Sequence, residues 1–264
     1  MRFLRIFLVW VAALGVLPLV PAQPQTAVPT LIIFAAADVG PAFREVIPQF
    51  EQAAHAKIVL VPGSTGVLAQ QIRNGAPADL FFAANESAID DLMHGDGLTQ
   101  DPLVLPASRA IYARGRLVLL TLQSSSLRLR DVKDLANASV RRIAIANPAH
   151  APYGLAAQQA LQSAGLWAAV QPRLVYGENV QQAVQFVQSG SADAGVVARS
   201  LAESPGLSWQ LVDQALHQPL NQTAVVVARS QHPRLALSFI SFVQGPGGRG
   251  VMKRFGFLIP GEDF

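Results

Sequence analysis

The stretch that decides the fold is PGSTGVLAQQIRNGAPADLFFAA, residues 62–84. It follows an apolar run at residues 58–61, which is typical of a buried strand. A turn of small residues at 63–66 comes next, and then a helical pattern in which Leu68 and Ile72 lie four positions apart with polar residues between them. The order of strand, small-residue turn and helix predicts one unit of an α/β sheet.

Both ends of this predicted helix carry local signals. Asn74-Gly75 follows the last periodic residue, as is typical of a helix C-terminus, and residues 79–83 form the next apolar run. At the other end, Ser64 and Thr65 bring two hydroxyls to a helix N-terminus, where free N–H groups and the helix dipole favour an anion. The plain alternative is that one of these hydroxyls only caps the helix.

Strands and helices alternate along the rest of the chain. Apolar runs and amphipathic patterns predict β-α-β-α-β-α over the first part, and a second β-α-β-α-β series after the pattern changes near residues 108–122. The predicted fold class is α/β with two lobes, each a mixed, mostly parallel sheet flanked by helices. The chain returns with a strand near 222, so we assign residues 27–112 and 222–264 to lobe 1 and 113–221 to lobe 2.

The N-terminus has the composition of an export signal. Arg2 and Arg5 precede a charge-free apolar run at 6–20, and small residues at 20–22 suit cleavage, so residues 1–22 are predicted to be a signal peptide. The alternative is a membrane anchor. An apolar run of about 15 residues falls short of the roughly 20 that a membrane span needs, which disfavours it.

Composition excludes several further classes. The chain has no cysteine, which excludes disulfides, thiolate metal sites, a cysteine nucleophile and a lipidated N-terminal cysteine. Loss of Arg2 and Arg5 with the signal lowers the formal charge from +3 to +1, so no strong positive field indicates nucleic acid as a partner. We therefore expect a monomer that is free in the periplasm.

Four strand-to-helix turns carry the candidate site. They lie at Ala37-Asp38, Ser64-Thr65, 151–153 and 179–180, two in each predicted lobe. Ligands of such sheets bind beyond the carboxyl ends of the strands, so we expect the turns to surround one small anion with N–H and hydroxyl donors. The turns contain no Lys or Arg, and a ring of donors can solvate the charge without a cation. Donors alone also select a fully ionised oxyanion.

Five short motifs occur in order along the chain. They are 34–37 (FAAA), 63–66 (GSTG), 75–81 (GAPADLF), 147–148 (NP) with 151–154 (APYG), and 254–257 (RFGF). Together they resemble one family, the periplasmic molybdate-binding proteins of ABC transporters, over essentially the whole mature chain. The resemblance implies a type II periplasmic-binding-protein fold with a tetrahedral dianion, molybdate or tungstate, in the cleft between the lobes. It also implies delivery to a membrane permease, with no catalysis, no cofactor and no direct metal-ion ligands.

The resemblance also implies which groups contact the anion. The expected contacts are the backbone N–H groups of Ala37, Asp38, Tyr153 and Val180, the N–H and hydroxyl groups of Ser64 and Thr65, and the Tyr153 hydroxyl as a further donor.

Two positions depart from the best-known branch of that family, which has a serine at Asp38 and a tyrosine at Ala198. Another branch, which this chain resembles, carries the Ala-Pro-Tyr-Gly turn in place of the tyrosine at the position of Ala198. A carboxylate about 4 Å from an anion would cost roughly 4 kcal/mol per charge pair at an effective dielectric constant near 20. We therefore hypothesise that the Asp38 side chain turns back to cap the helix beginning near Gly40-Pro41.

Other functions stay open. An enzyme could be imagined from Ser64, a histidine and Asp79, but GSTG is not the G-x-S-x-G elbow, and the histidines lack zinc spacing. His150, the one histidine in a candidate turn, is interpreted as a solvated loop residue. The main alternative is a receptor of the same fold for a different small oxyanion or anionic ligand, with Asp38 marking altered specificity. Organic acids are disfavoured because no turn carries an arginine, and the donor-rich turns disfavour a structural role.

Overall fold

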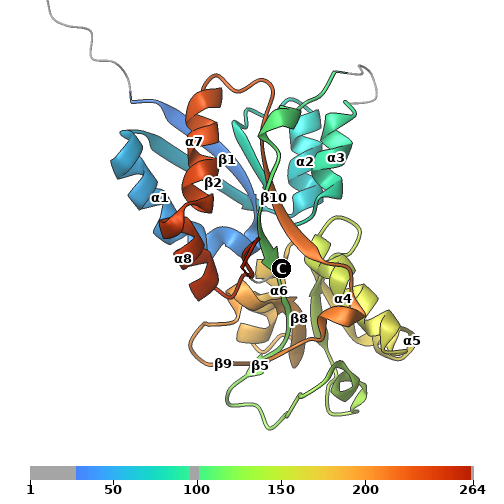
Figure 1. The fold of residues 1–264 in the computed structure, drawn as a ribbon. Coiled ribbons are helices and arrows are strands. Elements are labelled where there is room, and N and C mark those ends of the chain that lie inside the picture. Colours follow the sequence, from blue (N-terminus) through green and yellow to red (C-terminus); the bar gives the residue numbers. More distant parts are fainter. Residues whose placement is uncertain (1–27, 96–100, 263–264) are drawn as a thin grey trace, which may run out of the picture.

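Two five-stranded sheets form two lobes (Figure 1), as predicted. The computed structural model describes residues 28–95 and 101–262, so the predicted signal peptide at 1–22 lies outside the described residues. Within the described ranges, no helix is long and apolar enough to cross a membrane.

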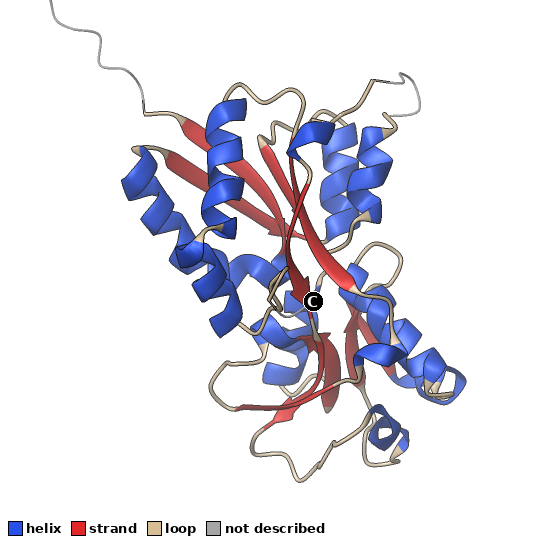
Figure 2. Cartoon of the chain, viewed as in Figure 1, coloured by secondary structure: helices blue, strands red, loops and turns tan. Residues whose placement is uncertain are grey.

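The first sheet has the strand order β2-β1-β3-β10-β4, and helices cover both of its faces (Figure 2). Its strands are β1 (Thr30–Ala36), β2 (Lys57–Gly63), β3 (Leu80–Ala83), β4 (Ala110–Gly115) and β10 (Leu220–Val226). Its helices are α1 (Gly40–Ala54), α2 (Thr65–Arg73), α3 (Ser87–Met93), α7 (Pro233–Gln244) and α8 (Pro246–Arg254), with 3-10 turns at Ala37–Val39 and Pro106–Ser108.

The second sheet has the order β7-β6-β8-β5-β9. Its strands are β5 (Leu117–Leu122), β6 (Ile143–Ala146), β7 (Leu174–Gly177), β8 (Ala194–Ala198) and β9 (Leu207–Leu211). Its helices are α4 (Pro152–Ser163), α5 (Trp167–Val170) and α6 (Val180–Gln188), with 3-10 turns at Val132–Ala136, Gln171–Arg173, Arg199–Leu201 and Gln214–Leu216.

The two sheets share one topology. In each, a single strand (β10 or β5) runs antiparallel to both of its neighbours, while the remaining strands run the same way. The chain crosses from the first sheet to the second between Gly115 and Leu117, and it returns between Leu211 and Leu220. β4 and β10 therefore extend a few residues past the lobe divisions expected at 112/113 and 221/222.

Two elements of the second lobe were absent from the sequence-based prediction, namely β9 and α5. β9 is an edge strand in which no residue is fully buried, so it lacks the apolar run that identifies a central strand. Its Trp209 lies beneath the Arg199 guanidinium, 3.9 Å from the ring centroid. This tryptophan therefore packs within lobe 2.

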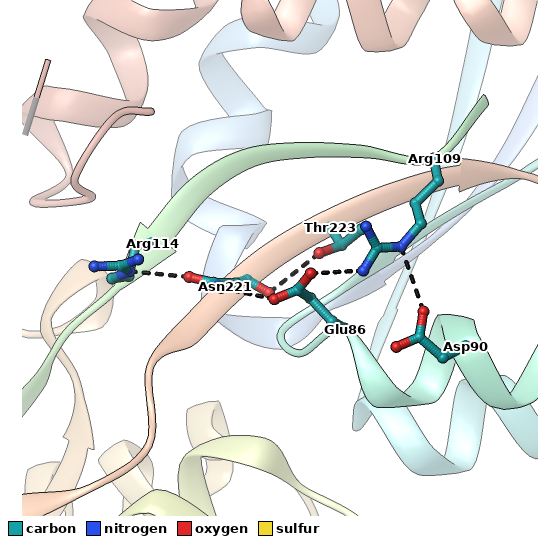
Figure 3. Close-up of polar contacts among 6 residues, drawn as sticks. All are labelled: Glu86, Asp90, Arg109, Arg114, Asn221 and Thr223. Carbon is teal, nitrogen blue, oxygen red and sulfur yellow. Dashed lines mark hydrogen bonds and ion pairs between the residues drawn. The ribbon is translucent and has the colours of Figure 1, made fainter. Parts of the chain in front are cut away.

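A polar cluster ties the loop after β3 to the strands that run toward the second lobe (Figure 3). The Glu86 carboxylate accepts hydrogen bonds from Arg109, at 2.5 Å, and from Asn221 on β10, at 2.7 Å. Asn221 also accepts from the Arg114 guanidinium on β4. The hydrogen bond from the Asn221 amide has the largest influence on the pKa of Glu86 and lowers it. Burial acts in the opposite direction, and Arg109 lowers the pKa further. The net effect holds the pKa of this carboxyl below its usual range. The cluster thereby fixes the loop that leads away from Ala84.

Candidate functional site

The four predicted turns meet at one small cavity between the lobes. Its lining includes all six residues singled out from the sequence, three helix starts and the 3-10 turn before α1. The lining residues are Ala36, Ala37, Asp38, Gly63, Ser64, Thr65, Ala84, Ala151, Pro152, Tyr153, Asn179 and Val180.

The helix starts give this cavity its donor character. α2 begins after Ser64, α4 begins with Pro152, and α6 begins at Val180 after Asn179, whose side chain accepts from the Gln182 N–H at 3.1 Å. The first N–H groups of an α-helix have no acceptor within the helix, and the dipole places partial positive charge at the same end. The lining contains no lysine or arginine, so these donors, together with hydroxyls, are the groups available to an anion.

The cavity is narrow. Its volume is about 10 Å³, which is roughly the room for one water molecule. A tetrahedral oxyanion therefore needs the lobes to part slightly. A wider hollow of about 300 Å³ opens on lobe 2 beside β5 and β9, but no helix start lines it.

Direct contacts hold the lobes together at the edge of the cavity. The Ser64 hydroxyl donates to the His150 carbonyl oxygen at 2.6 Å and lies 2.9 Å from the His150 Nδ1. The Gly66 N–H donates to the same carbonyl at 2.9 Å. His150 lies in a loop, as interpreted, but its side chain is only partly exposed and its ring contacts Ser64. Its carbonyl satisfies donors of α2 on the opposite lobe, a role that the sequence around it does not signal.

The two hydroxyls of the second turn behave differently. Ser64 begins α2 without a side-chain capping bond, and its one proton is directed at His150. Thr65 Oγ1 instead accepts from the Ala84 N–H at 3.1 Å, which leaves its hydroxyl proton to be donated. Of the two, Thr65 is the hydroxyl donor that the structure leaves ready for the cavity.

Asp38 does not cap α1, so that hypothesis was wrong. The N-cap of α1 is Val39, with no side-chain capping bond. Asp38 is fully buried, and its Oδ2 accepts from the Tyr153 hydroxyl across the cleft at 2.9 Å. The Ser200 hydroxyl of lobe 2 donates to the Asp38 carbonyl at 2.8 Å. Tertiary contacts with the second lobe outcompete a local cap, because a donor that reaches a buried carboxyl satisfies it where water cannot.

Burial also sets the protonation of this residue. Loss of solvation raises the pKa of Asp38 from 3.8 to about 7, although the hydrogen bond from Tyr153 acts in the opposite direction. The pKa values of Tyr112 and Tyr153 are both raised well above 10, first by burial and then by the nearby Asp38 charge. Both phenols therefore stay neutral.

Two polar residues that the sequence reading missed complete this cluster. Gln222 on β10 is fully buried, donates to the Tyr153 hydroxyl and accepts from Tyr112, each at 3.3 Å. Ser200 contacts Asp38, as described above. The available signal was a glutamine in a strand, although the neighbouring Asn221 and Thr223 of β10 are polar as well. Gly115 is required beside them, since a Cβ there would lie 2.0 Å from the Tyr153 hydroxyl.

The imagined catalytic triad does not assemble. Asp79 accepts from the Ile32 N–H and the Ser230 hydroxyl, and these bonds occupy both carboxylate oxygens. His150 does contact Ser64, but the carboxylate nearest its other ring nitrogen, on the exposed Glu178, is 3.9 Å away, which is too long for a hydrogen bond. Among the described residues there is no group of three or more His, Cys, Asp and Glu arranged to hold a metal ion.

Ala198 lies fully buried at the end of β8 and is not part of the cavity lining. Tyr153, on α4, is the tyrosine that lines the cavity. Its hydroxyl is donated to Asp38, so it is not a free donor in this structure.

A two-lobed α/β fold with a donor-lined cavity between the lobes defines a solute-binding protein. The sequence model of the bacterial extracellular solute-binding proteins matches residues 31–258, and the chain belongs to this family. It is 32% identical to the molybdate-binding protein ModA of Azotobacter vinelandii over 81% of this chain and 84% of the relative. It is 28% identical to the molybdate-binding protein ModA of Escherichia coli over 87% of this chain and 89% of that relative.

Solved structures agree with these relatives. The periplasmic molybdate-binding protein of Azotobacter vinelandii matches with a TM-score of 0.80 at 33% identity, covering 87% of this chain and 99% of that one. The sulfate-binding protein SubI of Mycobacterium tuberculosis matches with a TM-score of 0.73 at 19% identity, which shows a shared fold alone. The fold therefore serves receptors of different oxyanions, and specificity has to be argued from the cavity.

Proposed function

We propose that this chain captures molybdate, and tungstate with it, for delivery to the permease of an ABC transporter. The observation that carries the proposal is the meeting of the helix starts and the 3-10 turn from both lobes around one cavity without lysine or arginine. Such a site solvates an oxyanion by N–H and hydroxyl donors. The choice of anion is supported by the relatives, which are named as molybdate-binding proteins.

We infer that the contacts are those expected from the sequence, except for the hydroxyls of Ser64 and Tyr153, which are donated within the protein. Val180 at the start of α6, together with Tyr153, provides N–H groups from lobe 2. Ala37 and Asp38, with Ser64 and Thr65, provide N–H groups from lobe 1, and Thr65 adds a hydroxyl. All of these reach the oxygen atoms of the anion and none reaches the metal, and the protein needs no cofactor of its own.

The proposed mechanism is capture by closure, without catalysis. The anion bridges both lobes and shifts the equilibrium toward the closed form, which a permease distinguishes from the open form. The crossings at 115–117 and 211–220 connect the lobes and are the natural hinge. We propose that the monomer acts in the periplasm after removal of residues 1–22.

A rigid donor ring also explains selectivity. A smaller anion such as sulfate leaves some donors unpaired, and each unpaired buried donor costs about 1–3 kcal/mol. The alternative is a receptor of the same fold for a different oxyanion. One observation favours this alternative: Asp38, whose carboxyl is buried, lines the cavity, and a site that binds an anion through N–H and hydroxyl donors alone does not require a carboxyl group.

The test is calorimetric titration of the purified protein with molybdate, tungstate, sulfate and phosphate at neutral pH. We expect one-to-one binding of molybdate and tungstate and no heat with sulfate or phosphate. Preference for phosphate or sulfate would replace molybdate by the alternative ligand. No binding of any of the four would contradict the proposed function.

A further inference from the structure

Asp38 is a buried acid at a site built for an anion. It carries the only carboxyl group in the cavity lining and has no exposed surface. Its Oδ2 accepts the Tyr153 hydroxyl, while its Oδ1 is buried without a hydrogen-bond partner. A buried polar oxygen with no partner is costly, and it demands either a donor or a proton.

Among the described residues, the elements packed around Asp38 provide no cation that compensates its charge. The packed elements contribute the phenols of Tyr153 from α4 and Tyr112 from β4, while α6 and β10 carry no ionisable side chain. The charged side chains on the other packed elements are Glu45, paired with Arg254; Glu51, paired with Lys57; Arg199, paired with Glu203; Arg44, beside a separate surface hollow; and Arg114, bonded to Asn221.

A dianion in the same cavity would lie close to this carboxylate, because Asp38 lines the cavity. A neutral carboxyl group removes the repulsion, and its O–H turns an unpartnered acceptor into one more donor. We propose that Asp38 takes up one proton from solvent when the oxyanion binds and presents that proton to it, so that Asp38 couples affinity to pH. This inference rests on the proposed function. Burial, which raises the pKa of Asp38 to about 7, places the coupling near neutral pH.

Molybdate itself stays a dianion across neutral pH, so proton uptake can be assigned to the protein. The experiment is titration of the purified protein with molybdate at several pH values, in paired buffers that differ in ionisation enthalpy. We expect close to one proton taken up per anion well above pH 7, declining at lower pH. We also expect the dissociation constant to rise about tenfold per pH unit above that point.

The matched variant is Asp38→Asn. Asparagine keeps the shape, can accept from Tyr153 and can donate an N–H to the anion, but it cannot titrate. We expect it to bind molybdate without proton uptake and with a dissociation constant that is flat with pH. At about pH 9 it should therefore bind about 100-fold more tightly than the native protein. The proton count on the native protein tests the proposal even if this variant folds poorly.

His150 is the control for another source of pH dependence, because a charged imidazole at the cleft would also favour an anion at low pH. The His150→Asn variant should keep the proton uptake.

Loss of the proton uptake in that variant, or an affinity of the native protein that does not change with pH, would overturn the assignment to Asp38 while leaving molybdate binding intact. Tighter binding of phosphate than of molybdate, abolished by Asp38→Asn, would also overturn it, because the carboxylate would then be accepting a proton from the ligand. Absence of binding at every pH would instead overturn the proposed function.

Discussion

The two lobes have the same topology, but their cores contain different side chains and they contribute different polar groups to the cavity. The core of lobe 1 contains a chain of edge-to-face aromatic contacts, in which Phe239 meets Phe43, Phe50 and Phe82 with ring centroids 5.0–5.7 Å apart. The core of lobe 2 is built mainly from Ala, Val, Leu and Ile. Identical strand order therefore does not require similar side chains, because hydrophobic burial is largely non-directional and topology follows from the period of the pattern.

The cavity faces differ in a related way. Both lobes contribute helix starts, but lobe 1 adds a carboxyl group and two hydroxyls, whereas lobe 2 adds one phenol and one amide. Backbone donors therefore come from both sides of the cavity, whereas the carboxyl group that titrates near neutral pH lies on one side only.

The largest expected effect tests the core comparison. Phe239→Ala should reduce the free energy of unfolding by about 3–5 kcal/mol, because it leaves a large cavity and removes three aromatic contacts. In lobe 2, Val196→Ala removes two methyl groups from an equally buried position and should cost about 1–2 kcal/mol. Urea unfolding of both variants measures the contrast, and equal losses would show that the aromatic cluster adds nothing special.

The next effect concerns the charge on the lobe 1 face. The pKa of Asp38 is about 7 in the folded protein and 3.8 for an ordinary solvated aspartate, so between about pH 4 and pH 7 the folded state binds more protons than the unfolded state. The stability that this group contributes is therefore complete below about pH 4 and is lost as pH rises through about 7, by roughly 4 kcal/mol in all.

Urea unfolding from pH 4 to 8 of the native protein and of Asp38→Asn measures this linkage. The difference between the two curves, which cancels other titrating groups, should show the decline with rising pH in the native protein. A difference independent of pH would contradict the protonation of Asp38 in the folded state.

A smaller effect tests the contact between lobes. A Cβ on Gly66 would lie 2.8 Å from the His150 carbonyl oxygen, so Gly66→Ala should oppose closure and weaken anion binding by about tenfold. Its own helix should not suffer, because alanine is favoured over glycine in helices. The control is Gly250→Ala in α8, where a Cβ meets no atom within 4 Å, and its affinity should not change. Calorimetry and thermal melting separate the two effects.

The smallest effect concerns the polar cluster that anchors the loop after β3. Glu86→Gln keeps the bond from Asn221 but removes the ion pair with Arg109, and partly exposed pairs contribute about 0–1 kcal/mol. Because the pKa of Glu86 is lowered in the folded protein, its contribution is present above the unfolded pKa and is lost as pH falls. Urea unfolding at neutral and acidic pH should show a deficit only at neutral pH, and an equal deficit at both would contradict the linkage.

Part of the site could be predicted from sequence because it depends on local pattern. A small-residue turn between a strand and an amphipathic helix fixes where the backbone donors lie, and parallel strands bring such turns to the same edge of each sheet. That is why Thr65 and Val180 were placed correctly at the cavity. Asp38 was also placed there, but its side-chain partner was missed, since Tyr153 lies on the other lobe.

The sequence by itself determined the alternation of strands and helices, the two-lobed α/β class and the identity of the turns, because these depend on short-range periodicity and turn chemistry. The tertiary structure decided which side chains meet across the cleft. The pairs that meet there are 69 to 115 residues apart in the chain: His150 with Ser64, Asp38 with Tyr153, and Gln222 with Tyr153 and Tyr112. Only the packing of the lobes brings them together, and only the resulting burial raises the pKa of Asp38 to about 7.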